Sequence, residues 1–346
     1  MNEISEQRGK RLLDWYSEHK RDLPWRRTTD PYGIWVSEIM LQQTQVITAM
    51  RYFLNWMERF PTVESLAQAD EQDVLAAWQG LGYYRRCRML LEGARFVAQT
   101  GMPTTSEEWL RVPGVGPYTA GAIASIAFQE ASAVVDGNVE RVFARLTVCD
   151  LEGTRLNRAA WDWANANMIA ERASDWNQAI MELGATVCRP LQPECSECPV
   201  SSICRAKQLD QVSRFPKAKA RPKMVHQRHI VWVPICDGRL GVSQIPPGQW
   251  WEGMWEFPRQ VLASRTDPLR LGEIVGEADV KPVGRFRHAV THHQIDLEVS
   301  VAHPSEQSQA LAWFTIEELD DLALPAPQRR ALEMVLRATG EFATPD

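Results

Sequence analysis

Four of the seven cysteines are confined to the short segment 188–204. Cys188, Cys195, Cys198 and Cys204 have the spacing C-x6-C-x2-C-x5-C, which brings four soft thiolates close enough in sequence to ligate one metal centre. Structural zinc usually uses two tight C-x2-4-C pairs, whereas only the middle pair is tight here, so the spacing favours a 4Fe-4S cluster over zinc. Because all four ligands would be used, such a cluster would be structural or would transfer electrons.

A glycine-rich turn precedes a small-residue helix at residues 112–128 (VPGVGPYTAGAIASIAF). Gly114 and Gly116 leave backbone N–H groups exposed at the N-terminus of that helix, which suits a phosphate. We therefore predict a helix-hairpin-helix element that binds the DNA backbone independently of sequence. A generic turn between two helices is the alternative. Further along, Asp136 begins the helix of AVVDGNVERVFARL, where an aspartate taken alone is an ordinary N-cap.

The elements that would position these residues are helical up to about residue 205. Apolar periodicity in residues 34–60 predicts one long helix or two short ones, with Glu38 and Gln42 sharing a face as i, i+4 neighbours. Further amphipathic helices are expected to begin near Asp70, Tyr84, Ser106 and Asn157.

After residue 226 the pattern changes. The segments HIVWVPI and QIDLEVSVA are short β-rich runs, while residues 314–322 and 327–339 are expected to be helical. We expect a multidomain protein: an all-α domain at 1–206, a basic linker at 207–226 and an α+β domain at 227–346.

Length and charge agree with this division. A chain of 346 residues with 45% hydrophobic content can form two domains with their own cores. The net charge of -6 comes from residues 227–346, whereas residues 1–226 are balanced, and a basic, proline-containing segment at 214–228 spans the boundary between the two parts. That segment would lie on phosphate, or would simply be a solubilising linker. The sequence has no apolar run of membrane-spanning length and no signal peptide, so we expect a cytoplasmic monomer associated with DNA and not with membranes.

Taken together, these motifs resemble the endonuclease III superfamily and, within it, the MutY adenine DNA glycosylases. The resemblance is carried by LPWR (23–26), SEIMLQQTQV (37–46), GLGYYRR (80–86), VPGVGPYTAGAI, VDGNVERV and the four-cysteine loop. It implies base excision repair with a 4Fe-4S cofactor, acting on double-stranded DNA that contains adenine opposite 8-oxoguanine or guanine.

The resemblance also implies catalytic roles. Adenine is a poor leaving group unless it is protonated, and the remaining sugar develops oxocarbenium charge, so the site needs one acid and one fixed carboxylate. Glu38 would be the acid, Asp136 the carboxylate, and Asn138 and Tyr118 would orient them. To act near neutral pH, Glu38 needs a pKa raised by burial among apolar neighbours. Tyr118 stands where bifunctional relatives carry a lysine, so no Schiff-base nucleophile is present.

The target base must leave the duplex to be reached. By resemblance, Gln43 and Tyr83 would wedge into the base stack, and Thr44 and Leu81 would contact the opposite damaged guanine. Four residues would line the adenine pocket: Trp25, Arg26, Leu41 and Glu182.

Residues 227–340 resemble the Nudix-like domain of the same family, through GMWEFP (253–258) and FRHAVTHHQID (286–296). Arg259 replaces an expected glutamate and no REXXEE run follows, which indicates recognition without hydrolysis. Thr291 and His292 would read the lesion, but Val290 replaces the family's aromatic residue.

Two other interpretations remain at this point. One is a pyrimidine-lesion glycosylase with lyase activity, which Tyr118 disfavours. The other is a catalytically silent DNA-binding or redox-sensing protein, against which the Glu38 and Asp136 pair argues, since a binding module needs neither.

Overall fold

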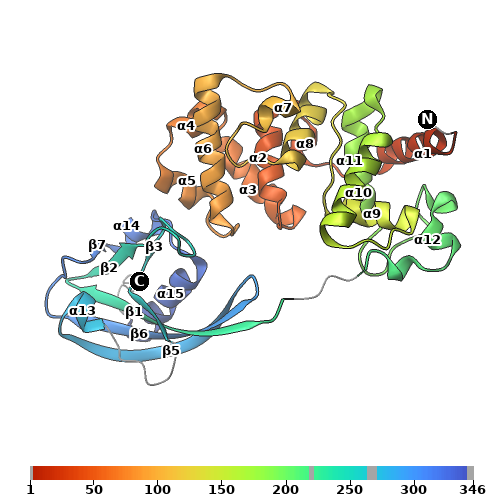
Figure 1. Ribbon diagram of the computed structural model, residues 1–346. Helices are drawn as coiled ribbons and strands as arrows, with labels where there is room; N and C mark the ends of the chain where they lie inside the picture. Colours follow the sequence, from red (N-terminus) through yellow and green to blue (C-terminus); the bar gives the residue numbers. More distant parts are fainter. Residues whose placement is uncertain (1–2, 218–221, 263–270, 341–346) are drawn as a thin grey trace. The chain divides into compact units, whose positions relative to one another are not determined.

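A computed structural model describes residues 3–217, 222–262 and 271–340, so residues 218–221 of the expected linker lie outside the described residues. The chain forms two compact units (Figure 1). The first unit comprises Met1–Gln68 and Arg88–Ala220, and the second comprises Ala69–Cys87 and Arg221–Asp346. The second unit thus combines residues 69–87 with the C-terminal part of the chain. The expected domains, in contrast, are each one continuous stretch of the sequence.

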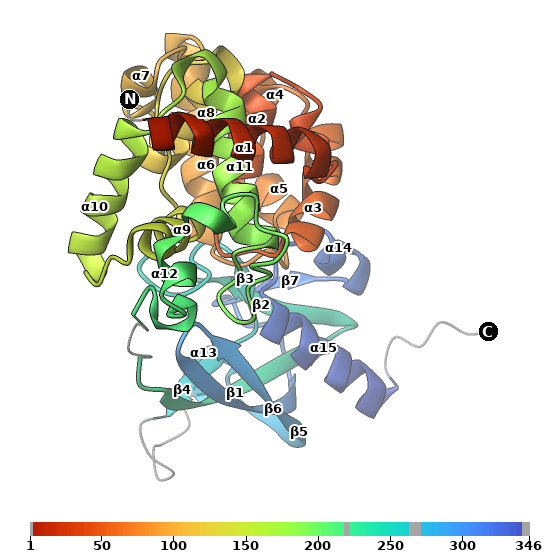
Figure 2. The same cartoon turned by 90° about the vertical axis from the view of Figure 1, so that its right-hand side faces the viewer.

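The first unit is all helical, as predicted, with no strand in residues 3–217. Its helices are α1 (Glu3–His19), η1 (Pro24–Arg26), α2 (Pro31–Leu41), α3 (Val46–Arg59), α4 (Val63–Gln68), α6 (Tyr84–Thr100, whose first residues belong to the second unit), α7 (Ser106–Trp109), α8 (Pro117–Phe128), α9 (Gly137–Thr147), α10 (Gly153–Ala166), η2 (Ala170–Arg172), α11 (Ala173–Thr186), η3 (Ser201–Ile203), α12 (Arg205–Gln208) and η4 (Val212–Arg214). Figure 2 shows α1 crossing α11, against which it packs.

The apolar stretch 34–60 forms two helices, because the helical backbone conformation is interrupted between Leu41, the end of α2, and Val46, the start of α3. Asp30 caps α2 by accepting hydrogen bonds from the backbone N–H groups of Tyr32 and Gly33, and the helix ends at Leu41. Gln42 is therefore the C-cap, and Gln43 has a positive φ of 54°. The expectation that Glu38 and Gln42 share one helix face is wrong, since the helix stops before Gln42.

Helices α9 and α11 form the centre of the core that positions the pocket. Val139, Val142, Ile180 and Leu183 are all buried in their contact. Gly184 permits this close approach, because a Cβ added there would lie 2.5 Å from the Cβ of Asn138. The residue at the start of α9 is consequently fixed by a helix that comes much later in the chain.

The predicted hairpin lies between α7 and α8. Gly114 has a φ of 78°, and a Cβ there would lie 2.6 Å from the Cβ of Met89, so this turn requires glycine on two counts. Gly116 is the N-cap of α8, Pro117 occupies its first turn, and an added Cβ at Gly116 would meet nothing within 4 Å. The N-terminus of α8 therefore has open space beside its backbone.

The second unit contains a sheet and helices, which confirms the α+β prediction for the C-terminal part. Its elements are α5 (Glu71–Ala77), β1 (Val225–Cys236), β2 (Arg239–Gln244), β3 (Trp255–Glu256), β4 (Arg259–Leu262), α13 (Leu271–Val275), β5 (Ala278–Val290), β6 (His293–Pro304), β7 (Ala312–Phe314), α14 (Ile316–Asp320) and α15 (Ala326–Thr339). Phe314 lies in β7 and α14 begins at Ile316, so the helix expected over 314–322 is shorter than predicted.

The sheet has the order β3-β2-β1-β6-β5, with β4 paired to β1 and β7 to β2. Strands β1 and β6 are parallel, whereas β5 and β6 form an antiparallel hairpin closed between Val290 and His293. Helix α15 packs on β1, β5 and β6, burying the core around Phe257, Leu297 and Leu332. The hairpin turn contains Thr291, which has a positive φ of 53°.

Candidate active site

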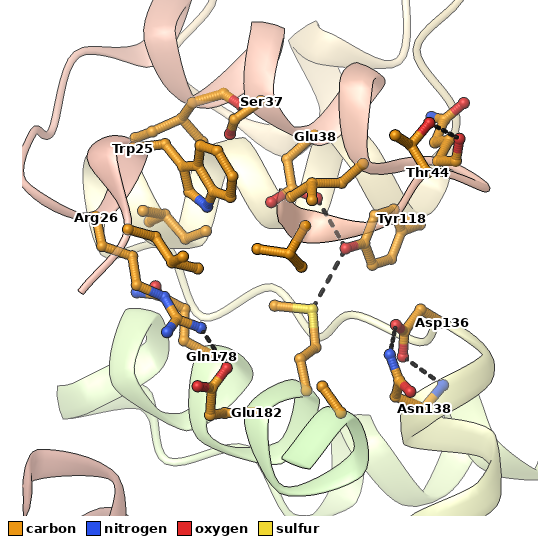
Figure 3. A pocket seen from close by; sticks show the side chains of 18 of the residues that line it. Trp25, Arg26, Ser37, Glu38, Thr44, Tyr118, Asp136, Asn138, Gln178 and Glu182 are labelled. Atoms are coloured by element: carbon orange, nitrogen blue, oxygen red, sulfur yellow. Dashed lines mark hydrogen bonds and ion pairs between the residues drawn. The ribbon is translucent and has the colours of Figure 1, made fainter. Parts of the chain in front are cut away.

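A pocket of roughly 570 Å³ opens in the first unit, lined by η1, α2, α8, the start of α9 and α11 (Figure 3). This size is within the range of about 300–1,000 Å³ typical of small-molecule sites. Ten of the residues selected from the sequence line it: Trp25, Arg26, Glu38, Leu41, Gln43, Thr44, Tyr118, Asp136, Asn138 and Glu182. Figure 3 shows Trp25, Arg26 and Glu182 on one side and Asp136 and Asn138 on the other.

Glu38 is a buried carboxyl group with one strong partner. Its side chain is only 5% exposed, and Oε2 accepts a hydrogen bond of 2.7 Å from the Tyr118 hydroxyl, which also lies 3.3 Å from the Met181 sulfur. Burial raises the pKa of Glu38 to about 7; the Tyr118 hydrogen bond opposes this shift, and the Asp136 carboxylate adds to it. The carboxyl group can therefore hold a proton near neutral pH, as a general acid must.

Asp136 is the N-cap of α9, and its carboxylate is fixed by three hydrogen bonds. Oδ1 accepts from the backbone N–H groups of Asn138 and Val139 at 2.9 and 2.8 Å, and Oδ2 accepts from Asn138 Nδ2 at 2.7 Å. Burial raises the pKa of Asp136, while these donors oppose the shift. Asp136 thus caps α9 and also lines the pocket, and capping fixes the orientation of its carboxylate.

Asn138 is itself held from the side away from Asp136. Its Oδ1 accepts a 2.8 Å hydrogen bond from Arg141 Nη2, and Arg141 Nε donates to the Cys188 carbonyl at 2.8 Å. The pocket carboxylate and the start of the cysteine loop are therefore connected through α9.

Glu182 is held by two arginines. Its carboxylate accepts from Arg21 Nε and Nη2 at 2.7 and 2.8 Å and from Arg26 Nη2 at 2.9 Å. Burial alone would raise the pKa of Glu182, but these hydrogen bonds lower it to about 2. Glu182 is thus a permanent anion, in contrast to Glu38, and the two carboxylates can perform different tasks.

The four cysteines follow α11 and wrap the end of α9. Arg145 is 3% exposed; its Nη1 lies 3.3 Å from Cys188 Sγ and donates to the Arg189 carbonyl at 2.7 Å. Burial, with smaller contributions from the three other cysteines of the loop, raises the pKa of the Cys198 thiol to about 12. The pKa of Cys198 thus depends on the three other thiols of the loop.

Within the described ranges, no group of three or more His, Cys, Asp or Glu side chains is arranged to hold a metal ion.

The remaining selected residues lie elsewhere. Gly114 and Gly116 form the hairpin turn, Thr291 and His292 form the turn between β5 and β6, and the segment that holds Leu81 and Tyr83 belongs to the second unit. Tyr83 is 44% exposed, whereas Leu81 is buried.

No helix of the described residues has the length and apolar character needed to cross a membrane.

The pocket lining also includes residues that were not selected from the sequence, among them Arg21, Ser37, Gln178 and Met181. Gln178 lies one helical turn before Glu182 on α11, so a helical-face argument would have found it. Arg21 has no such signal, because its partner Glu182 is 161 positions away.

Comparisons with known proteins agree with this geometry. Residues 36–165 match the model of the HhH-GPD superfamily of base excision DNA repair proteins, and residues 230–334 match the NUDIX domain. A thermostable thymine-DNA glycosylase structure is similar over 60% of this chain and 98% of its own, with a TM-score of 0.54 and 27% identity. An endonuclease III trapped on DNA is similar in fold over 61% of this chain and 99% of its own, with a TM-score of 0.52 and 20% identity. The first unit thus has the helical fold of the HhH-GPD superfamily of base excision DNA repair proteins.

Curated relatives narrow this class. The Mus musculus adenine DNA glycosylase is 47% identical over 394 residues, covering 93% of this chain and 76% of the relative. The Homo sapiens adenine DNA glycosylase is 43% identical over 288 residues, covering 77% of this chain. The chain belongs to the adenine DNA glycosylase family. It spans 50% of the human relative and 48% of the Arabidopsis thaliana relative.

Proposed function

We propose that this protein hydrolyses the N-glycosidic bond of adenine mispaired with 8-oxoguanine or guanine in double-stranded DNA. The observation that carries the proposal is the protonatable carboxyl of Glu38, which lies in the same pocket as the fixed carboxylate of Asp136. The adenine DNA glycosylase relatives support it.

The chemistry follows from the two protonation states. Glu38 donates its proton to a ring nitrogen of adenine, so the electron pair of the breaking C–N bond leaves with a neutral base. The sugar becomes an oxocarbenium ion, which the anionic Asp136 stabilises until water adds to it. Tyr118 keeps Glu38 oriented, and Asn138 keeps Asp136 oriented.

Strand cleavage is not part of this mechanism. Tyr118 occupies the hairpin position where a lysine amine would attack the sugar, and its hydroxyl is already bonded to Glu38. The enzyme should leave an abasic site that breaks only after alkali, with little covalent complex trapped by borohydride.

Cys188, Cys195, Cys198 and Cys204 would hold a 4Fe-4S cluster, which would stabilise the loop after α11 and could transfer an electron. The support for the cluster is the spacing of the four cysteines in one loop after α11, where Arg145 Nη1 lies 3.3 Å from Cys188 Sγ. The purified protein should hold about four irons per chain and should absorb visible light at about 400 nm. Stoichiometric zinc without iron after anaerobic purification would refute the cluster.

The C-terminal part would read the opposite base without hydrolysing nucleotides. Arg259 stands where a glutamate is expected, and its Nε donates to Glu256 Oε2 at 2.8 Å, so Glu256 is ion-paired with a cation of the same chain. Thr291, in the β5–β6 turn and exposed, offers its hydroxyl to the lesion, with His292 beside it.

One experiment tests the activity directly: single-turnover cleavage of duplexes carrying adenine opposite 8-oxoguanine, adenine opposite guanine, and thymine glycol. We expect adenine release from the first two and none from the third. Release of thymine glycol with efficient borohydride trapping would instead assign the protein to the bifunctional class.

A further inference from the structure

Two hydrogen bonds join residues 69–87 to the C-terminal part of the second unit. Gln72 Nε2, on α5, donates to the Gly253 carbonyl at 2.9 Å, and both groups are partly buried. Arg329 Nη2, on α15, lies 3.2 Å from Gln79 Oε1. We call these two contacts the clasp. They stand at the two ends of α5, one near its start and one two residues beyond its end.

Both anchors on the C-terminal side are fixed independently of the clasp. Gly253 has a φ of 76°, and its N–H donates to the Ile245 carbonyl at 2.9 Å. Arg329 Nη2 also donates to the Asp320 and Leu322 carbonyls at 3.0 and 3.1 Å, so the two hydrogens of this nitrogen are shared among these carbonyls and Gln79 Oε1. The clasp therefore attaches α5 to groups that are already ordered, which limits the entropy lost on forming it.

The clasp leads directly into the loop of residues 80–83. This loop is shaped by its own hydrogen bonds: Trp78 Nε1 donates to the Gly82 carbonyl at 3.0 Å, and the Gly80 N–H donates to Tyr84 Oη at 3.1 Å. Tyr83 has a φ of 50°, a rare conformation for an aromatic residue, and is 44% exposed. The conformation of the loop that exposes Tyr83 is thus fixed by hydrogen bonds within the loop. The clasp affects only how the loop is attached to the C-terminal part of the second unit.

We propose that Gln72, Gln79 and Arg329 are positioning residues that couple opposite-base reading by the β5–β6 turn to the placement of the Leu81 and Tyr83 loop on the same duplex. This inference rests on the proposed function. When the C-terminal part binds the lesion, the clasp holds the loop of Leu81 and Tyr83 in one orientation on the same duplex. A lesion-containing duplex is then favoured over an undamaged mispair by more than the contacts of Thr291 and His292 supply.

Matched variants separate the clasp bonds from side-chain size. Gln72→Glu keeps the shape but removes the donor, whereas Gln72→Lys keeps a donor for the Gly253 carbonyl. Gln79→Leu removes the acceptor, whereas Gln79→Glu keeps one for the Arg329 guanidinium. Arg329 stays unchanged because it also orders residues 320–322. Gln99→Leu, at an exposed site on α6, is the control for loss of a glutamine.

Two measurements are made on the full chain with its cluster. Hydrogen exchange of the peptide covering residues 78–84 reports whether the loop is released. Single-turnover rates of adenine excision opposite 8-oxoguanine and opposite guanine give a preference ratio. For Gln72→Glu/Gln79→Leu we expect faster exchange and a ratio roughly three- to tenfold lower, since one net hydrogen bond corresponds to roughly fivefold. Gln72→Lys/Gln79→Glu and Gln99→Leu should retain both values.

The outcomes are distinct. Unchanged exchange in the double variant refutes the clasp, and faster exchange with an unchanged ratio refutes the coupling. Equal losses of both rates with a lower melting temperature would indicate a merely structural role and would also refute it. If the wild-type protein excises no adenine, the proposed function fails, whereas the exchange comparison still decides whether the clasp holds the loop.

Discussion

At the scale of single residues, burial raises the pKa of Glu38 to about 7, which places its proton loss within the physiological range. We expect the single-turnover rate of adenine excision to fall as the pH rises above about 7, approaching tenfold per pH unit, because only the protonated carboxyl can donate. Glu38→Gln should lower the rate at least about a hundredfold and flatten this pH dependence. A near-wild-type rate in Glu38→Gln would remove the acid from the mechanism.

The same carboxyl should cost stability at high pH. Folded Glu38 binds its proton more tightly than the unfolded residue, so the folded state loses stability as the pH rises from about 4.5 to about 7. Glu38→Gln should therefore be more stable than the wild type at pH 8, by up to about 3 kcal/mol, with the advantage vanishing toward pH 4. Urea unfolding at both pH values measures this. Equal stability at pH 8 would show that the carboxylate is better solvated than its burial indicates.

Glu38, Tyr118 and Asp136 could be selected from the sequence because each lies in a contiguous motif that carries the family resemblance, although Asp136 taken alone is an ordinary N-cap. The pKa of Glu38 could not be predicted in magnitude, since it depends on burial by helices distant in the chain. Arg21 was missed for the same reason: its role exists only through Glu182, and no local pattern connects the two.

At the scale of elements, the crossing of α9 and α11 depends on Gly184. A Cβ at this position would lie 2.5 Å from the Asn138 Cβ and 3.1 Å from its Cα and carbonyl oxygen, so backbone must move. Gly184→Ala should destabilise the protein by about 1–3 kcal/mol and lower excision more than it lowers duplex affinity, since Asn138 orients Asp136. Heat unfolding and single-turnover rates check both effects.

Gly137→Ala is the matched control for the unfolding measurement, because an added Cβ there meets nothing within 4 Å. If Gly184→Ala and Gly137→Ala unfold alike, the helices have room to separate and the close approach is unimportant.

Apolar periodicity identified most helices, but it left open whether residues 34–60 form one helix or two. The break depends on Gln43 at a φ of 54°, and glutamine gives little warning of a left-handed conformation, which Gly, Asn and Asp adopt far more often. The helix predicted over residues 314–322 was too long, because Phe314 pairs with Leu240 in the sheet. Apolar periodicity within one segment cannot reveal such a contact with a distant strand.

At the scale of the whole molecule, composition and charge indicated a helical part, a basic segment and an α+β part. The association of residues 69–87 with the C-terminal part was not predictable in this way. Gln72 and Gly253 are 181 positions apart, and contiguous boundaries assign α5 to the helical domain. Tertiary hydrogen bonds of this kind have no local sequence signal.

This association sharpens what removal of the C-terminal part should do. Truncation at about residue 226 keeps Glu38, Asp136 and the hairpin, so adenine opposite guanine should still be excised, while the preference for 8-oxoguanine should fall about five- to a hundredfold, as the loss of one or two hydrogen bonds implies. Thr291→Val should have a smaller effect in the same direction.

Truncation also removes both C-terminal anchors of the clasp. Adding Gln72→Glu/Gln79→Leu to the truncated chain should therefore leave the preference ratio unchanged, although the same pair of substitutions lowers the ratio in the full chain. Single-turnover rates on the two mispairs are measured for the wild type and for each of these variants. An additional loss in the truncated double variant would show that Gln72 and Gln79 act within the helical part alone, and an unchanged ratio after truncation would place discrimination around Thr44 and Leu81.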